Sequence, residues 1–200
     1  MAAIPAEQVK ALRDKTGAGF MECKAALTEA HGNIEQAVDI LRKRGLAQAA
    51  KKAGRSTQQG QVGAYIHAGG KIGVLIEVNC ESDFVAKTAD FKTLVKELAM
   101  QVAAADPKYV RREEVPAEEL ERERAIYRAQ MENQGKPAKV LDKIVEGKLN
   151  SYFERVVLVD QPSIRDGNVK VSALIAQTVA KVGENITVSR FARFKVGEAA

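Results

Sequence analysis

The sequence predicts an α+β fold, in which an N-terminal module of three helices is followed by helices packed on a small antiparallel sheet. Apolar residues recur at helical spacing near the N-terminus and again through the second half of the chain. Between these regions, two runs of alternating apolar residues flank a Gly-Gly turn, as in a β-hairpin. Aromatic residues make up only 5% of the 200 residues and Trp is absent, so the core has to be built from Ala, Val, Leu and Ile.

Residues 1–45 are predicted to form three short helices. Gly17 and Gly19 interrupt the first helical pattern, because glycine permits the backbone angles of a tight reversal. Asn33 follows Gly32 and is suited to cap the third helix. The apolar residues predicted to line the inner faces of these helices are Val9, Leu12, Phe20, Cys23, Leu27, Ile34, Ala37, Val38 and Leu41.

Residues 46–60 have an Ala-rich, then basic, then polar composition and little apolar surface to bury. We therefore expect the third helix to extend into a basic and polar linker at 46–60. The linker would separate a first domain at 1–45 from a core domain at 61–200.

The core domain is predicted to begin with a hairpin at 61–79 that turns at Ala68–Lys71. A helix is expected from about Thr88 to Ala104, where the apolar stripe is the clearest in the chain. Further helices are expected after Pro116, over the apolar stripe from Val140 to Tyr152, and from Val171 to Val182. Asn185–Val196 is predicted to be a strand that pairs with the hairpin.

The charge balance is basic, with a formal net charge of +5 and a pI of about 9.2. Such a surplus suits nucleic acid, a ribosome, an anionic membrane or an acidic protein, and does not choose among them. The two cysteines, Cys23 and Cys80, are far apart in the chain and are interpreted as reduced thiols. With neither a signal-like N-terminus nor an apolar run long enough to span a bilayer, we expect a cytoplasmic protein.

The sequence offers little for catalysis, and we expect no enzyme, no catalytic residue and no cofactor. His31 and His67 are the only histidines, and neither belongs to a cluster with metal-ligand spacing, so no metal site is expected. Gly69-Gly70-Lys71 lacks the other residues of a phosphate-binding loop and is explained by a hairpin turn. The basic stretch at 42–55 is interpreted as a solvated helix end, with RNA contact as the alternative.

Ser82-Asp83-Phe84-Val85 stands at a predicted transition from strand to helix. The pattern alone favours a buried Phe84 that plugs the core beside a capping acid. An exposed Phe84 would instead be an anchor for a pocket on another protein.

Four segments together resemble the elongation factor Ts family, in the order in which that family carries them. They are Leu12–Leu27 (LRDKTGAGFMECKAAL), Ile76–Ala86 (IEVNCESDFVA), Lys143–Leu149 with Asp160–Pro162, and Gly183–Phe194 (GENITVSRFARF). Three positions depart from the usual pattern: Phe20 replaces Met, Ser82 replaces Thr, and Ser163 replaces Phe. The chain is also shorter than family members that carry a duplicated core and a coiled-coil insertion.

The resemblance implies a ubiquitin-associated-like domain at the N-terminus, elongation factor Tu as the partner, and guanine-nucleotide exchange as the activity. It assigns displacement of the partner's Mg²⁺ to Ser82, Asp83, Phe84 and Val85. It assigns contacts with the partner's GTP-binding domain to Arg13, Phe20, Met21 and Lys24. Since the core is not duplicated, we expect a homodimer, with no membrane and no direct nucleic acid contact. The rival interpretations are an RNA- or ribosome-binding protein and an enzyme with an unrecognised site.

Overall fold

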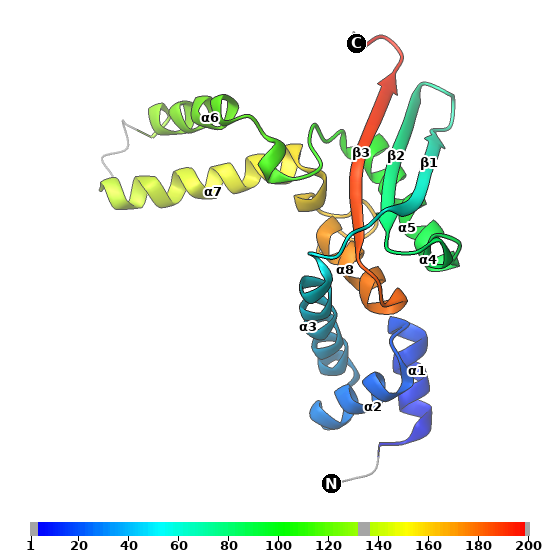
Figure 1. Cartoon of the computed structure of the whole chain (residues 1–200). Coiled ribbons are helices and arrows are strands. Elements are labelled where there is room, and N and C mark those ends of the chain that lie inside the picture. The colour runs from blue at the N-terminus through cyan, green and yellow to red at the C-terminus, as the bar shows by residue number, and fades with distance from the viewer. Residues whose placement is uncertain (1–3, 132–136, 199–200) are drawn as a thin grey trace. The chain divides into compact units, whose positions relative to one another are not determined.

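The computed structural model describes residues 4–131 and 137–198 and has the α+β fold that the sequence predicts (Figure 1). The chain forms two compact units, each assembled from separate stretches. One comprises Met1–Val62, Glu77–Val95 and Ala173–Val188, and the other comprises Gly63–Ile76, Lys96–Ser172 and Ser189–Ala200. The sequence predicts domains that are each continuous in the chain, at 1–45 and 61–200 with a linker at 46–60, and these boundaries stay a prediction.

The first unit begins with three helices, α1 (Ala6–Thr16), α2 (Phe20–Glu29) and α3 (Ile34–Lys52), each of which contacts the other two. Asn33 caps α3 as predicted, because its side chain accepts a hydrogen bond of 3.1 Å from the backbone N–H of Gln36. Helix α3 continues to Lys52, so the first part of residues 46–60 is helical. The buried core of the three helices consists of Val9, Leu12, Cys23, Ala26, Leu27, Ala30 and Ala37.

A three-stranded antiparallel sheet has the order β1-β2-β3, with β1 (Gln59–Ile66), β2 (Ile72–Cys80) and β3 (Ile186–Lys195). The hairpin and the C-terminal strand are therefore confirmed. Side chains alternate across β2, because successive residues of a strand point to opposite faces. Val74, Ile76, Val78 and Cys80 are buried, whereas Leu75 is exposed.

The predicted long helices are also present: α5 (Ala89–Ala105), α6 (Ala117–Ala129), α7 (Ala138–Val156) and α8 (Val171–Val182). Among the described residues, three short elements were not predicted, namely helix α4 (Asp83–Ala86) and the 3₁₀ turns at Arg112–Glu114 and Leu158–Asp160. All three are too short to show a hydrophobic period in the sequence.

Helices α6 and α7 of the second unit lie side by side and antiparallel (Figure 1). Arg124 lies 3.8 Å from Glu146, and Arg128 lies 3.7 Å from Asp142, so the pairing runs in opposite chain directions. At the other end of the pair, the Tyr152 hydroxyl donates a hydrogen bond to Glu119. The apolar stripe of α7 is buried at Val145, Leu149 and Tyr152.

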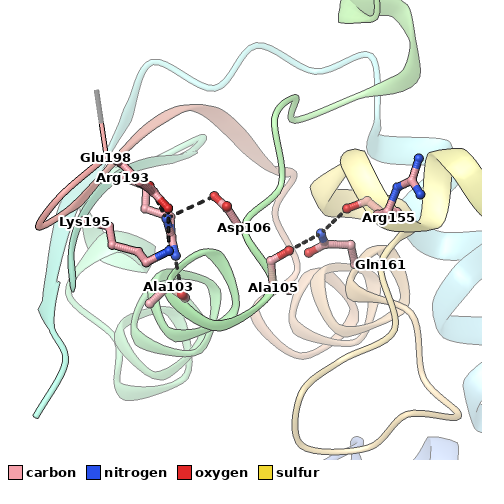
Figure 2. Close-up of polar contacts among 8 residues, drawn as sticks. All are labelled: Ala103, Ala105, Asp106, Arg155, Gln161, Arg193, Lys195 and Glu198. Carbon is pink, nitrogen blue, oxygen red and sulfur yellow. Dashed lines mark hydrogen bonds and ion pairs between the residues drawn. The ribbon is translucent and has the colours of Figure 1, made fainter. Parts of the chain in front are cut away.

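Two polar side chains fix backbone segments within the second unit (Figure 2). Gln161 is buried, and its Nε2 donates to the carbonyls of Ala105 at 3.2 Å and Arg155 at 3.0 Å. Arg193 of β3 lies 3.3 Å from Asp106 and 3.2 Å from Glu198, and its Nε donates to the Ala103 carbonyl at 3.4 Å. These contacts tie the end of α5 to the end of β3 and to the segment after α7.

Candidate functional site

The candidate site begins where β2 ends and α4 starts. Ser82 is the N-cap of α4, and its Oγ accepts a hydrogen bond of 3.4 Å from the backbone N–H of Val85. A helix of one turn is not stable by itself in water. The side chains of Val85 and Ala86 are buried and attach the turn to the first unit.

The ring of Phe84 points outward and is 79% exposed. The interpretation of Phe84 as a core plug is therefore wrong. Because Ser82 starts the helix, Val85 and Ala86 take the inward positions and Phe84 is left on the opposite side. The Nζ of Lys87 lies 6.0 Å from the centroid of the ring, and no aromatic ring among the described residues packs against Phe84. Phe84 thus presents an apolar surface to the solvent.

Asp83 precedes this ring and is also exposed. It does not cap α4, since Ser82 does. Its carboxylate accepts a hydrogen bond of 2.6 Å from Lys87, and this bond is the main reason why the pKa of Asp83 is lowered. Asp83 is therefore a carboxylate at neutral pH, one residue before the exposed ring.

Both cysteines are buried free thiols. The Cys80 thiol donates a hydrogen bond of 3.1 Å to the Ser82 carbonyl. Burial is the first cause that raises the pKa of Cys80, followed by the negative charge of Glu184. A thiol with a raised pKa is a poor nucleophile, so Cys80 serves as a packing residue beneath the junction.

The four residues assigned to partner contact on the N-terminal helices are all exposed: Arg13 on α1, and Phe20, Met21 and Lys24 on α2. The exposure of Phe20 corrects its predicted place on the inner face of α2. Met21 and Lys24 line a shallow apolar hollow on α2, together with Ala25, Thr28 and Glu29. Arg13 and Phe20 are not among its lining residues.

The remaining candidate features are a metal site, the histidines and the basic stretch at 42–55. Across the described residues 4–131 and 137–198, no cluster of His, Cys, Asp and Glu has the arrangement of a metal site. His67 is exposed and its Nδ1 lies 3.0 Å from the Tyr65 hydroxyl, in agreement with a solvated, hydrogen-bonded histidine. In the basic stretch, Arg44 is paired with Glu29 at 2.5 Å and Arg55 with Glu81 at 3.5 Å. No helix in the described part of the chain is long and apolar enough to cross a bilayer.

Sequence reasoning missed one residue that contacts the site directly. The carboxylate of Glu184, which follows α8, accepts hydrogen bonds from the backbone N–H of Ser82 at 2.9 Å and from its hydroxyl at 2.7 Å. Glu184 lies within the segment Gly183–Phe194, for which the sequence indicates a family resemblance but no role for Glu184 itself. No local period or spacing connects residues this far apart in the chain, so only the fold reveals the contact.

Comparison with known proteins identifies the family. A family model described as Elongation factor TS matches residues 6–198. A protein named Elongation factor Ts from Koribacter versatilis is 60% identical over 195 residues, which are 98% of this chain and 89% of that protein. Its namesake from Caldanaerobacter subterraneus subsp. tengcongensis is 57% identical, with 98% of both chains covered.

A third relative of that name, from Fervidobacterium nodosum, is 55% identical, covering 98% of this chain and 99% of its own. The chain is thus a translation elongation factor by class. It belongs to the elongation factor Ts family, as the resemblance of the four segments indicates.

Proposed function

We propose that this protein is a guanine-nucleotide exchange factor that binds elongation factor Tu carrying GDP and speeds the release of the GDP. The observation that carries the proposal is the exposed ring of Phe84, held on a turn that is anchored by the buried side chains of Val85 and Ala86. Large apolar side chains that are exposed at a fixed position are typical anchors of protein interfaces. No bond is made or broken by this chain in the proposed role, which takes place in the cytoplasm, where translation occurs.

In the proposed mechanism, Phe84 and Asp83 enter the GTP-binding domain of elongation factor Tu and displace the elements that hold Mg²⁺. In a GTPase, Mg²⁺ and the phosphate-binding loop hold the nucleotide phosphates mainly through charge. Once the metal site is displaced, the phosphate charge is poorly compensated and GDP leaves faster. Arg13, Phe20, Met21 and Lys24 are proposed to contact the same domain.

An exchange factor of this kind has to bind the nucleotide-free partner more tightly than the GDP-bound partner. By thermodynamic linkage, a nucleotide that rebinds weakens the interface by the same factor. A small set of anchor residues suits such a dissociable interface. The exposed positions of Phe84 and Met21 are consistent with this requirement.

We further propose that the protein is a homodimer that presents two copies of the site. The sheet supports this proposal, because Ile66, Leu75 and Phe194 are each about half exposed or more. A Cβ added to Gly73 would lie 3.1 Å from Cδ1 of Ile66, so the Ile66 side chain extends over β2. An exposed apolar sheet face is more often an interface than a solvated surface, and a second copy offers a matching face.

The test is the release of fluorescent GDP from purified elongation factor Tu. Wild-type protein should accelerate release strongly, and Phe84→Ala should lose on the order of 2 kcal/mol of that effect. Ile164→Ala is a suitable control, because it removes another exposed apolar side chain, 47% exposed, from a loop outside both candidate contact regions. Equal rates for wild type and Phe84→Ala would remove Phe84 from the mechanism.

The role of Mg²⁺ is tested in the same assay. Chelation of Mg²⁺ with EDTA should raise spontaneous GDP release and reduce the additional acceleration by wild-type protein, because the metal that the site displaces is already gone. An acceleration factor that is the same with and without EDTA would contradict displacement of the metal.

A further inference from the structure

Glu184 binds the first residue of the turn that carries Phe84. One carboxylate oxygen accepts the Ser82 backbone N–H at 2.9 Å, and the other accepts the Ser82 hydroxyl hydrogen at 2.7 Å. Hydrogen bonds to an ionised carboxylate are stronger than those between neutral groups. Ser82 is therefore held at two points by a residue that is remote in the sequence.

The contact also sets the direction of the Ser82 hydroxyl. A serine hydroxyl has one hydrogen to donate and two lone pairs that accept. Because the hydrogen points to Glu184, a lone pair is left for the backbone N–H of Val85, which lies 3.4 Å away. Glu184 thus orients the hydroxyl that caps α4.

The arrangement resembles a capping box whose second half comes from elsewhere in the chain. In an ordinary capping box, a Glu or Gln at the third helical position bonds back to the backbone N–H of the N-cap. In α4 that third position is Val85, which has no side-chain acceptor. Glu184 supplies the missing carboxylate for the Ser82 N–H.

A second, reciprocal contact stabilises Glu184 itself. The backbone N–H of Asn185 donates to Glu81 at 2.6 Å, and the Asn185 side chain is buried. Its Nδ2 donates to the carbonyls of Ala53 at 3.3 Å and Arg55 at 2.9 Å. Residues 81–82 and 184–185 therefore bind each other through two carboxylates, each accepting a backbone N–H from the opposite segment.

We propose that Glu184 is a positioning residue for nucleotide exchange: it fixes the turn at Ser82 so that Phe84 and Asp83 are presented in a single orientation. The inference rests on the proposed function and assigns a role in it to the Gly183–Phe194 segment. Glu184 does not need to touch the partner to act. It lowers the entropic cost of ordering an exposed ring at the moment of binding.

One variant and one matched control test the proposal. Glu184→Gln is nearly isosteric, but its amide nitrogen accepts no hydrogen bond, so one of the two Ser82 contacts is lost. Thr187→Val is the control, because it removes a different hydrogen bond, of 2.8 Å to Thr57, close to Glu184 in the chain.

Three readouts are compared: GDP release at increasing concentrations of each variant, thermal stability, and amide hydrogen exchange of the free protein. Glu184→Gln should lower the maximal rate of GDP release about tenfold, the loss expected for one hydrogen bond to a charged group. The amides of Ser82 and Val85 should exchange faster in this variant. Thr187→Val should lose stability but should retain both the rate of GDP release and the protection of the Ser82 and Val85 amides.

A double variant separates positioning from general stability. Glu184→Gln and Ser82→Ala act on the same hydrogen-bonded pair, so their effects on GDP release should not add when combined. Fully additive effects would overturn the proposal. The proposal would also be overturned if Glu184→Gln left both the rate of GDP release and the protection of the Ser82 amide unchanged. An equal loss of rate in Thr187→Val would overturn it too.

The inference about Glu184 can be tested even if the proposed function is wrong. If wild-type protein does not accelerate GDP release, the exchange function is wrong, and the amide measurements on the free protein then decide. Faster exchange at Ser82 and Val85 in Glu184→Gln, but not in Thr187→Val, would support the tether. Equal protection in the two variants would overturn it.

Discussion

Phe84 and Phe91 lie on consecutive helices of the same compact unit, yet Phe84 is 79% exposed and Phe91 is completely buried. The first prediction uses this contrast. Phe91→Ala should lower the free energy of unfolding by about 3–5 kcal/mol, because it removes a buried ring and leaves a cavity. Phe84→Ala should change it by less than about 0.5 kcal/mol, as expected for an exposed side chain.

Urea unfolding of both variants, followed by circular dichroism, measures the two differences directly. The slope of the transition should stay the same as in wild type, which shows that only stability has changed. A Phe84→Ala variant as unstable as Phe91→Ala would mean that the ring of Phe84 is packed in solution, and it would remove the anchor from the proposed mechanism.

Much of the fold follows from the sequence because its signals are local and periodic. The stripe of α5 and the alternation in β2 repeat over many residues, so they predict both the element and its buried face. The exposure of Phe84 could not be predicted in this way. A single turn has no period, and whether Phe84 or Val85 faces inward depends on which residue caps the turn.

The candidate site likewise has one part that the sequence predicts and one part that it does not. Ser82, Asp83 and Phe84 are adjacent in sequence and were recognised as one motif from the family resemblance. Glu184 reaches Ser82 only because α8 ends at Val182 and Gly183 adopts a positive φ of 80°, a backbone conformation that favours glycine. A contact of this kind is created by the turn after a distant helix and leaves no spacing signal.

The second prediction concerns Glu119, which accepts hydrogen bonds from two tyrosine hydroxyls, Tyr109 at 2.6 Å and Tyr152. The bond from Tyr109 is the largest cause that lowers the pKa of Glu119, and the bond from Tyr152 is the next. The same contact raises the pKa of Tyr109 to about 12. Glu119 therefore stabilises the base of the α6–α7 pair as a carboxylate.

The sign of the pH dependence follows from these directions. The lowered pKa of Glu119 contributes stability above its ordinary value of 4.5, and this contribution is lost as the pH falls through the folded-state pKa. The raised pKa of Tyr109 contributes stability below pH 10, and this is lost as the pH rises toward about 12. Folding should thus be weakened at both ends of the pH range.

Glu119→Gln should reduce the free energy of unfolding at pH 7 by about 1–2 kcal/mol, an amount discounted for partial exposure. The difference in stability between neutral and acidic pH should also shrink. Glu118→Gln, an exposed neighbour on α6, is the matched control. If both variants unfold alike at pH 7 in urea, Glu119 has no special role.

The third prediction concerns the charge beside Phe84. Lys87→Ala removes the hydrogen bond that is the main cause of the lowered pKa of Asp83. The pKa of Asp83 should therefore rise toward its ordinary value of 3.8. Titration of the Asp83 carboxyl carbon by NMR measures the change, and Lys92→Ala, an exposed lysine on α5, serves as the control. An unchanged Asp83 titration in Lys87→Ala would show that the pair is not formed in solution.

The fourth prediction tests the proposed dimer through the exposed face of the sheet. Phe194 is 67% exposed on β3, and Phe194→Glu would place a charge within the proposed contact. A buried, unpaired carboxylate costs several kcal/mol, so the dissociation constant should rise by about a hundredfold or more. Val140→Glu, which changes a 43% exposed valine on α7, is the control and should leave the dimer intact.

Light scattering at micromolar concentration gives the molecular mass of each variant. Wild type and Val140→Glu should scatter as dimers, and Phe194→Glu should scatter as a monomer with unchanged circular dichroism, because the substitution lies on an exposed strand position. A wild-type monomer at this concentration would contradict the dimer itself. A dimeric Phe194→Glu would contradict only the sheet face as its interface and would leave another surface to hold the two copies together.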